Sequence, residues 1–121
     1  MKTAKDPRHL KRIKLMQDLF SWQFSSKLKT TKILNPIISH LKEIDEFISK
    51  SAPDRPLEQI NKIDLAILRL AIFELIIESK VPPKVVVDEA VELGKEFGSD
   101  TSASFVNGAL GKLIKDKGIK T

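Results

Sequence analysis

A chain of 121 residues with 41% hydrophobic residues and no cysteine is long enough to bury one core, and it excludes disulfides, thiolate nucleophiles and cysteine metal sites. Its net charge of +5 is distributed as basic ends around an acidic middle. This pattern indicates two partners of opposite charge, one of them a polyanion. Basic ends that are merely solvated explain the charge equally well. The N-terminus does not have the pattern of a secretory signal. The most apolar stretch (63–77) is interrupted by charges and is shorter than the roughly 20 residues that cross a bilayer. We therefore expect a cytoplasmic protein without a membrane partner.

The first predicted helix begins at Asp6-Pro7, because a short acid caps a helix and proline suits its first turn, and it runs to about Phe24. Apolar residues at helical spacing predict its inward face: Leu10, Ile13, Met16, Phe20 and Phe24. Another side carries Arg8, Lys11 and Arg12 in the N-terminal half. We expect that basic side to project from the body of the protein, in a geometry suited to RNA.

Capping and breaking residues predict the remaining helices. The expected segments are Asn35-Pro36 to Ala52-Pro53, a short turn over Leu57 to Ile60, an apolar helix capped by Asn61 and reaching about 77, Lys84 to Phe97, and a last helix capped by Ser99 or Asp100. The apolar helix belongs at the centre of a bundle, Gly94 marks a close helix approach, and Gly98 ends its helix. The pattern predicts an all-α, compact bundle of about five to six helices.

Residues that support catalysis are few. The two histidines, His9 and His40, have no second ligand at metal-binding spacing, and no glycine-rich loop suits a phosphate. Asp88, Glu89 and Glu92 share one helix and could serve acid–base chemistry, but a solvated helix face explains them better. We therefore expect neither catalysis, a metal nor a cofactor.

Four segments carry a resemblance that covers about two-thirds of the chain. They are Ile63 to Leu75, Val81 to Leu93, Phe97-Gly98 with Phe105 to Leu110, and Phe20 to Gln23 after a basic helix. In their order along the chain they resemble the NusB family of transcription antitermination proteins. The resemblance implies a NusB-like all-α fold without catalytic activity, forming a single domain over 1–121 with helical subdomains at 1–55 and 56–121.

The resemblance also implies partners and site residues. Members of this family bind single-stranded boxA RNA of ribosomal RNA leaders together with NusE, a small-subunit ribosomal protein, and act in the elongation complex with other Nus factors. The family's arginine-rich run falls on Arg8, His9, Leu10 and Arg12, of which His9 and Leu10 depart from arginine. The expected RNA-binding residues are Lys5, Arg8, His9, Lys11, Arg12, Phe20 and Phe105, and Glu58 and Asp64 are expected to meet the basic protein partner.

Two alternatives stay open. Ribosomal RNA cytosine methyltransferases carry an RNA-binding domain that resembles this family, but they continue into an α/β cofactor domain, which we expect an open reading frame ending at Thr121 to exclude. The other alternative is a helical protein-interaction adaptor that has lost RNA binding, suggested by the weakened arginine run. The region between Gln23 and Arg55 is shorter than in typical members, so we expect a trimmed N-terminal subdomain.

Overall fold

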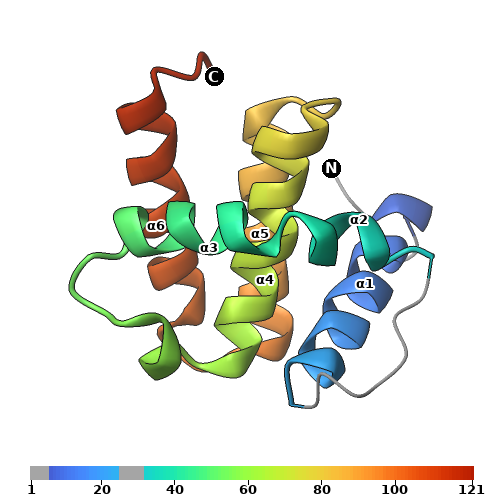
Figure 1. The fold of residues 1–121 in the computed structure, drawn as a ribbon. Helices are drawn as coiled ribbons and strands as arrows, with labels where there is room; N and C mark the ends of the chain where they lie inside the picture. The colour runs from blue at the N-terminus through green and yellow to red at the C-terminus, as the bar shows by residue number, and fades with distance from the viewer. Residues whose placement is uncertain (1–5, 25–31) are drawn as a thin grey trace.

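The computed structural model describes residues 6–24 and 32–121, and over these residues it is helical without a strand. The elements are α1 (Pro7–Phe24), α2 (Asn35–Ser39), α3 (Leu41–Ser51), the 3-10 helix η1 (Leu57–Gln59), α4 (Lys62–Ile72), the π-helix η2 (Phe73–Glu78), α5 (Pro83–Phe97) and α6 (Ser102–Lys117). Figure 1 shows α4 in the middle of the bundle, with α1 and α6 on opposite sides of it and α3 crossing in front. The predicted all-α bundle is confirmed.

The central helix is α4, as its sequence predicts. Every residue from Asp64 to Ile72 is buried, and Ala66 and Ile67 are completely enclosed. The cap at its start is also confirmed, because the side chain of Asn61 accepts hydrogen bonds from the backbone N–H groups of Ile63 and Asp64. Within the described residues, we find no helix with the length and apolar character that crossing a bilayer requires.

Beyond Ile72 the chain does not continue as an α-helix to 77 but widens into the π-helix η2. The Ser79 N–H donates to the carbonyl of Glu74 at 3.0 Å, a bond between residues five apart, and Ser79 takes a left-handed conformation with φ of 55°. The wider turn ends the central helix and places Glu74 in a buried position.

The helices α5 and α6 approach closely at two glycines. A Cβ on Gly94 would lie 3.1 Å from the backbone nitrogen of Ala103, and a Cβ on Gly98 would collide with the side chain of Ser102. The prediction of a close approach at Gly94 is confirmed. Gly98 ends α5 with extended backbone rather than a left-handed turn, so the need for glycine there is steric.

Two predicted helix caps are wrong, and so is the predicted length of one helix. The expected helix from Asn35 to Ala52 is divided at His40, whose backbone leaves helical values (φ −109°, ψ 13°) and whose ring Nδ1 lies 2.9 Å from the carbonyl of Pro36. Asn35 lies inside α2 and does not cap it. Helix α6 has no side-chain cap either; the Ser102 hydroxyl instead accepts a hydrogen bond from the N–H of Ser99.

Candidate functional site

Helix α1 packs against the bundle through a face that coincides only in part with the predicted one: Met16 is buried, and Ile13 and Phe20 are half-buried against the core. The buried residues of α1 are His9, Arg12, Met16 and Leu19. The prediction is wrong for Leu10 and Phe24, which are 48% and 63% exposed. The physical reason is that η2 and α5 present buried carboxylates toward α1, so the helix turns its cations inward to meet them.

Arg12 is the centre of this contact. Its Nε and Nη2 donate to both carboxylate oxygens of Glu74 at 2.8–3.2 Å, and its Nη1 donates to Oε1 of Glu89 at 2.9 Å. The hydrogen bonds to Glu74 outweigh the effect of burial and raise the pKa of Arg12 above its ordinary value. The expected solvent exposure of Arg12 is therefore wrong, because only 8% of the residue is accessible.

His9 lies one turn earlier and is buried as well, with 4% of the residue exposed. Its Nδ1 lies 3.2 Å from Oε2 of Glu89, and its Nε2 lies 2.6 Å from Oε1 of Glu96. Burial lowers the pKa of His9, but the hydrogen bonds to Glu96 and Glu89 raise it by more, so the net change is upward from 6.5. His9 and Arg12 thus attach α1 to α5 and η2.

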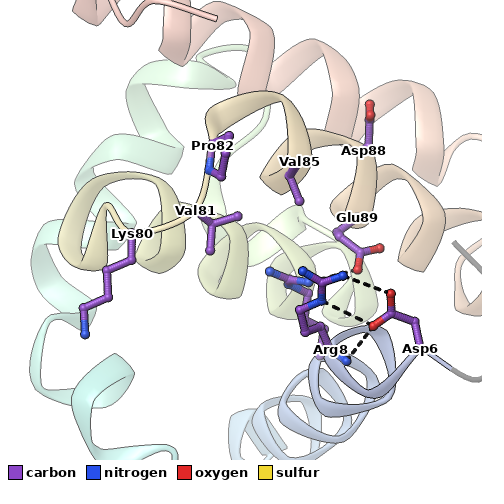
Figure 2. A pocket seen from close by; sticks show the side chains of 9 residues that line it. Asp6, Arg8, Lys80, Val81, Pro82, Val85, Asp88 and Glu89 are labelled. Carbon is purple, nitrogen blue, oxygen red and sulfur yellow. Dashed lines mark hydrogen bonds and ion pairs between the residues drawn. The ribbon is translucent and has the colours of Figure 1, made fainter. Parts of the chain in front are cut away.

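Arg8 and Lys11, the neighbours of these two residues, are exposed. The backbone N–H of Arg8 donates to Oδ1 of Asp6 at 2.8 Å, which confirms Asp6 as the helix cap, and the guanidinium contacts the same carboxylate at 3.4 Å (Figure 2). The Arg8 N–H lowers the pKa of the Asp6 carboxyl. Figure 2 shows Arg8 beside a hollow of about 550 Å³ that Val81, Pro82 and Val85 line.

A second hollow, of about 410 Å³, lies between α1, α2 and the turn that follows η2. Its apolar lining comes from Leu15, Ile33, Pro36, Ile37, Leu70, Phe73 and Val81. Arg8, Lys11, Lys32 and Lys80 also line it, and we call these four residues the basic rim. The carboxylates of Glu74 and Glu78 line the same hollow, but Glu74 is neutralised by Arg12.

Sequence reasoning missed two members of the basic rim as site residues. Lys32 belongs to the basic run that follows the first helix, which is a usable signal. Lys80 had no such signal, because its place beside α1 depends on the π-helix and the turn at Ser79. Lys5, another predicted site residue, lies outside the described residues.

The two aromatic residues predicted to bind RNA, Phe20 and Phe105, are half-buried, and the ring of each already contacts another side chain. Phe20 makes an edge-to-face contact with Phe24, with ring centroids 4.9 Å apart. The guanidinium of Arg55 lies 4.0 Å above the ring of Phe105, at cation–π distance. Phe105 lines neither hollow beside Arg8, so the structure does not bring it together with the basic rim.

The two acidic residues expected at the protein-partner surface differ in exposure. Glu58 is exposed and lines a hollow of about 480 Å³ with Trp22, Phe24, Leu57 and Lys62, among others. Asp64 is 3% exposed, and its Oδ1 has no hydrogen-bond partner in the part of the chain that the structure describes. The expectation that Asp64 offers a surface contact is therefore wrong. Among the described residues, no group of three side chains is arranged to hold a metal ion.

Comparison with known proteins identifies relatives of this chain. A family model described as the NusB family matches residues 9–115. A protein of Dehalococcoides mccartyi named "Transcription antitermination protein NusB" is 48% identical over 84 residues, which is 69% of this chain and 59% of the relative. A protein of the same name from Chloroflexus aggregans is 49% identical over 77 residues, 62% of this chain and 51% of the relative. The chain thus spans less than two-thirds of the length of these relatives.

Solved structures share the fold. T. maritima NusB superposes with a TM-score of 0.82 at 29% identity, covering 96% of this chain and 94% of that chain. A chain from a structure described as "Crystal Structure of a Plectonemic RNA Supercoil" gives a TM-score of 0.81 at 21% identity, covering 94% and 98%. At that identity the second likeness shows the fold and nothing more.

Proposed function

The chain belongs to the NusB family, and on that premise we propose that it is a non-catalytic transcription antitermination factor that binds boxA-like single-stranded RNA of ribosomal RNA leaders. In this proposal it acts in the cytoplasm with the small-subunit ribosomal protein NusE, in the elongation complex with other Nus factors. The relatives named "Transcription antitermination protein NusB" support this function.

The basic rim is the observation that carries the RNA-binding part of the proposal. Single-stranded nucleic acid needs cations that follow its phosphates and apolar surface that receives its bases. The hollow between α1 and α2 offers both, with exposed Arg8, Lys11, Lys32 and Lys80 around an apolar lining. Among the described residues, Lys11, Lys32 and Lys80 have no carboxylate partner.

The proposal assigns four of the basic residues of α1 two different tasks. Arg8 and Lys11 meet phosphates, whereas His9 and Arg12, which are buried among carboxylates, hold the helix that presents them. Phe20 and Phe105 stay predictions as base-stacking rings. For Phe105, a base would stack on the guanidinium of Arg55 or replace it.

A salt titration tests the RNA-binding function. With about four phosphates neutralised on a single strand, log affinity should fall with log salt at a slope near −3, because each contact contributes about −0.7. Replacing both Arg8 and Lys11 by alanine should reduce the magnitude of that slope by about 1.4. The matched control replaces Lys50 of α3 and Lys115 of α6, two exposed lysines outside the hollow, and should leave the slope unchanged.

The same titration decides between the leading proposal and the adaptor alternative. Binding of boxA-like RNA that NusE strengthens supports the antitermination factor. Absence of binding to that RNA with NusE present overturns it and favours a helical adaptor that has lost RNA binding. The buried state of Arg12 and the replacement of arginine at Leu10 are the observations in favour of the adaptor.

For the protein partner, we propose the hollow at Glu58 as the docking surface. NusE is basic by the resemblance, and Glu58 places an exposed carboxylate beside exposed apolar surface from Phe24. Charge reversal with Glu58→Lys should slow association with NusE, because rim charges mainly set the association rate. Glu46→Lys, at an exposed site on α3, is the control. Equal association rates for the two variants would refute this docking surface.

A further inference from the structure

The ring of His9 is held by a carboxylate at each nitrogen. Nδ1 faces Glu89 and Nε2 faces Glu96, at 3.2 Å and 2.6 Å. A neutral imidazole has one N–H and one lone pair, so one of its nitrogens would face a carboxylate oxygen without a proton between them. Donation from both nitrogens requires the imidazolium. The geometry therefore specifies a buried, positively charged His9.

His9 is part of a continuous charged cluster that joins three elements. The titratable and charged groups around it are Glu89 and Glu96 of α5, Glu74 of η2, Arg12 of α1, and Asp6, which caps α1. The Glu89 carboxylate is shared, since Oε2 contacts His9 and Oε1 accepts from Arg12. Arg69 of α4 lies outside the cluster, because it contacts Gln23 at the other end of α1 and Asp45 of α3.

Within this cluster, the two cations respond differently to pH. Arginine keeps its charge at every pH that a protein survives, whereas the unperturbed pKa of histidine lies near neutrality. Loss of the His9 proton removes one cation and leaves a nitrogen lone pair against a carboxylate oxygen of Glu89 or Glu96. The Arg12 contacts stay in place, so the effect is confined to the first turns of α1.

We propose that His9 is a proton-dependent latch, whose imidazolium holds the first turns of α1 against α5 and whose deprotonation releases them. Arg8 and Lys11 lie on these turns, so the latch also governs how firmly they are presented to RNA. This second part rests on the proposed function. The first part concerns the fold and stands independently of it.

The direction of the pH dependence follows from the ion pairs. Burial lowers the pKa of His9 and the contacts with Glu96 and Glu89 raise it by more, so the folded value lies above the ordinary 6.5. A cation with a raised pKa contributes its full stabilisation below the unfolded value and loses it as pH rises through the folded value. The latch is therefore closed in mild acid and opens toward alkaline pH.

NMR on the full chain tests the latch. We expect the imidazole of His9 to titrate above the ordinary value of 6.5, and Glu96→Gln to move the His9 midpoint downward. His40 is exposed and has no carboxylate contact in the described part of the chain, so His40→Gln is the control variant. Glu96 has a side chain that is 40% exposed, so this variant should fold.

Hydrogen exchange provides the structural readout. Exchange rates are first corrected for the intrinsic pH dependence of exchange. Protection of the amides of Ile13 and its neighbours should then fall above the His9 midpoint, by up to about tenfold for each unit by which the pKa of His9 is raised. The amides of α4 should keep their protection, and His9→Gln should abolish the pH dependence in α1. If the His9 imidazole titrates at or below 6.5, or if α1 is equally protected on both sides of the His9 midpoint, the latch is refuted.

Affinity for boxA-like RNA at pH 6 and pH 8.5, in the presence of NusE, tests the link to function. We expect weaker binding at the higher pH in the natural chain and in His40→Gln, and a smaller difference in His9→Arg, which keeps its charge. If RNA binds strongly and its affinity does not change with pH while His9 titrates, the proposal that the latch governs RNA binding is refuted. Absence of RNA binding at both pH values with pH-dependent exchange in α1 refutes the proposed function and leaves the latch standing.

Discussion

The two halves of α1 are attached to the same bundle by different chemistry. The N-terminal half is attached through His9 and Arg12, whose buried cations meet carboxylates of α5 and η2. The C-terminal half is attached through Met16 and Leu19, which are completely buried and apolar. Ion pairs are directional and depend on protonation, whereas apolar burial depends on area and volume. One helix therefore has a fixed end and an end that solution conditions can influence.

The largest effect should follow from Arg12→Ala. This change leaves the carboxylates of Glu74 and Glu89 buried without their guanidinium, which costs about 3–5 kcal/mol of unfolding free energy. Chemical denaturation measures the loss. Lys11→Ala, which removes an exposed cation one position away, should change stability by less than about 0.5 kcal/mol. Similar losses for both variants would contradict the division between buried and exposed cations.

Met16→Ala should cost nearly as much but respond differently to pH. Removing a fully buried Met side chain costs about 3 kcal/mol through lost burial and the cavity that remains. Because no ionisable group takes part, the loss should be the same at pH 6 and pH 8.5 in denaturation experiments. Leu10→Ala, at a site that is 48% exposed, is the control and should cost less. A pH-dependent loss for Met16→Ala would remove the contrast between the two halves.

A smaller effect should follow from Gln23→Ala at the C-terminal end of α1. The Gln23 amide accepts from Nη1 of Arg69 at 3.1 Å and donates to the carbonyl of Lys62 at 2.9 Å. A side-chain hydrogen bond contributes about 1 kcal/mol net, and Arg69 keeps its ion pair with Asp45, so we expect a loss of about 1–2 kcal/mol by denaturation. Gln17→Ala, at an exposed position of α1, should be nearly neutral. A larger loss than that of Met16→Ala would show that this end depends on polar contacts.

Local signals in the sequence predicted much of the fold. The Asp6-Pro7 start of α1, the Asn61 cap and the enclosed position of α4 depend on residues that are close together along the chain. The close approach at Gly94 was predicted from the cost of glycine within a helix. These features follow from backbone preferences and apolar periodicity, which a sequence displays directly.

The orientation of α1 could not be predicted in the same way. A helical projection allowed Leu10 and Phe24 to face inward, and the groups that reversed this choice are Glu74, Glu89 and Glu96, more than 60 residues away in sequence. The same carboxylates made His9 and Arg12 structural rather than exposed. Burial of a cation depends on counter-charges that the tertiary structure supplies, and the sequence of the helix does not contain that information.

The π-helix at Phe73–Glu78 has a consequence for how the chain tolerates insertions and deletions. Its wider turn shifts the phase of the side chains, so residues before and after it do not follow one helical wheel. Deleting one residue here would restore an α-helix and turn every following side chain by about 100° relative to α4. Glu74 sits at the hydrogen bond that closes this turn. The single additional residue thus adjusts the phase between the centre of the bundle and the turn that carries Lys80 of the basic rim.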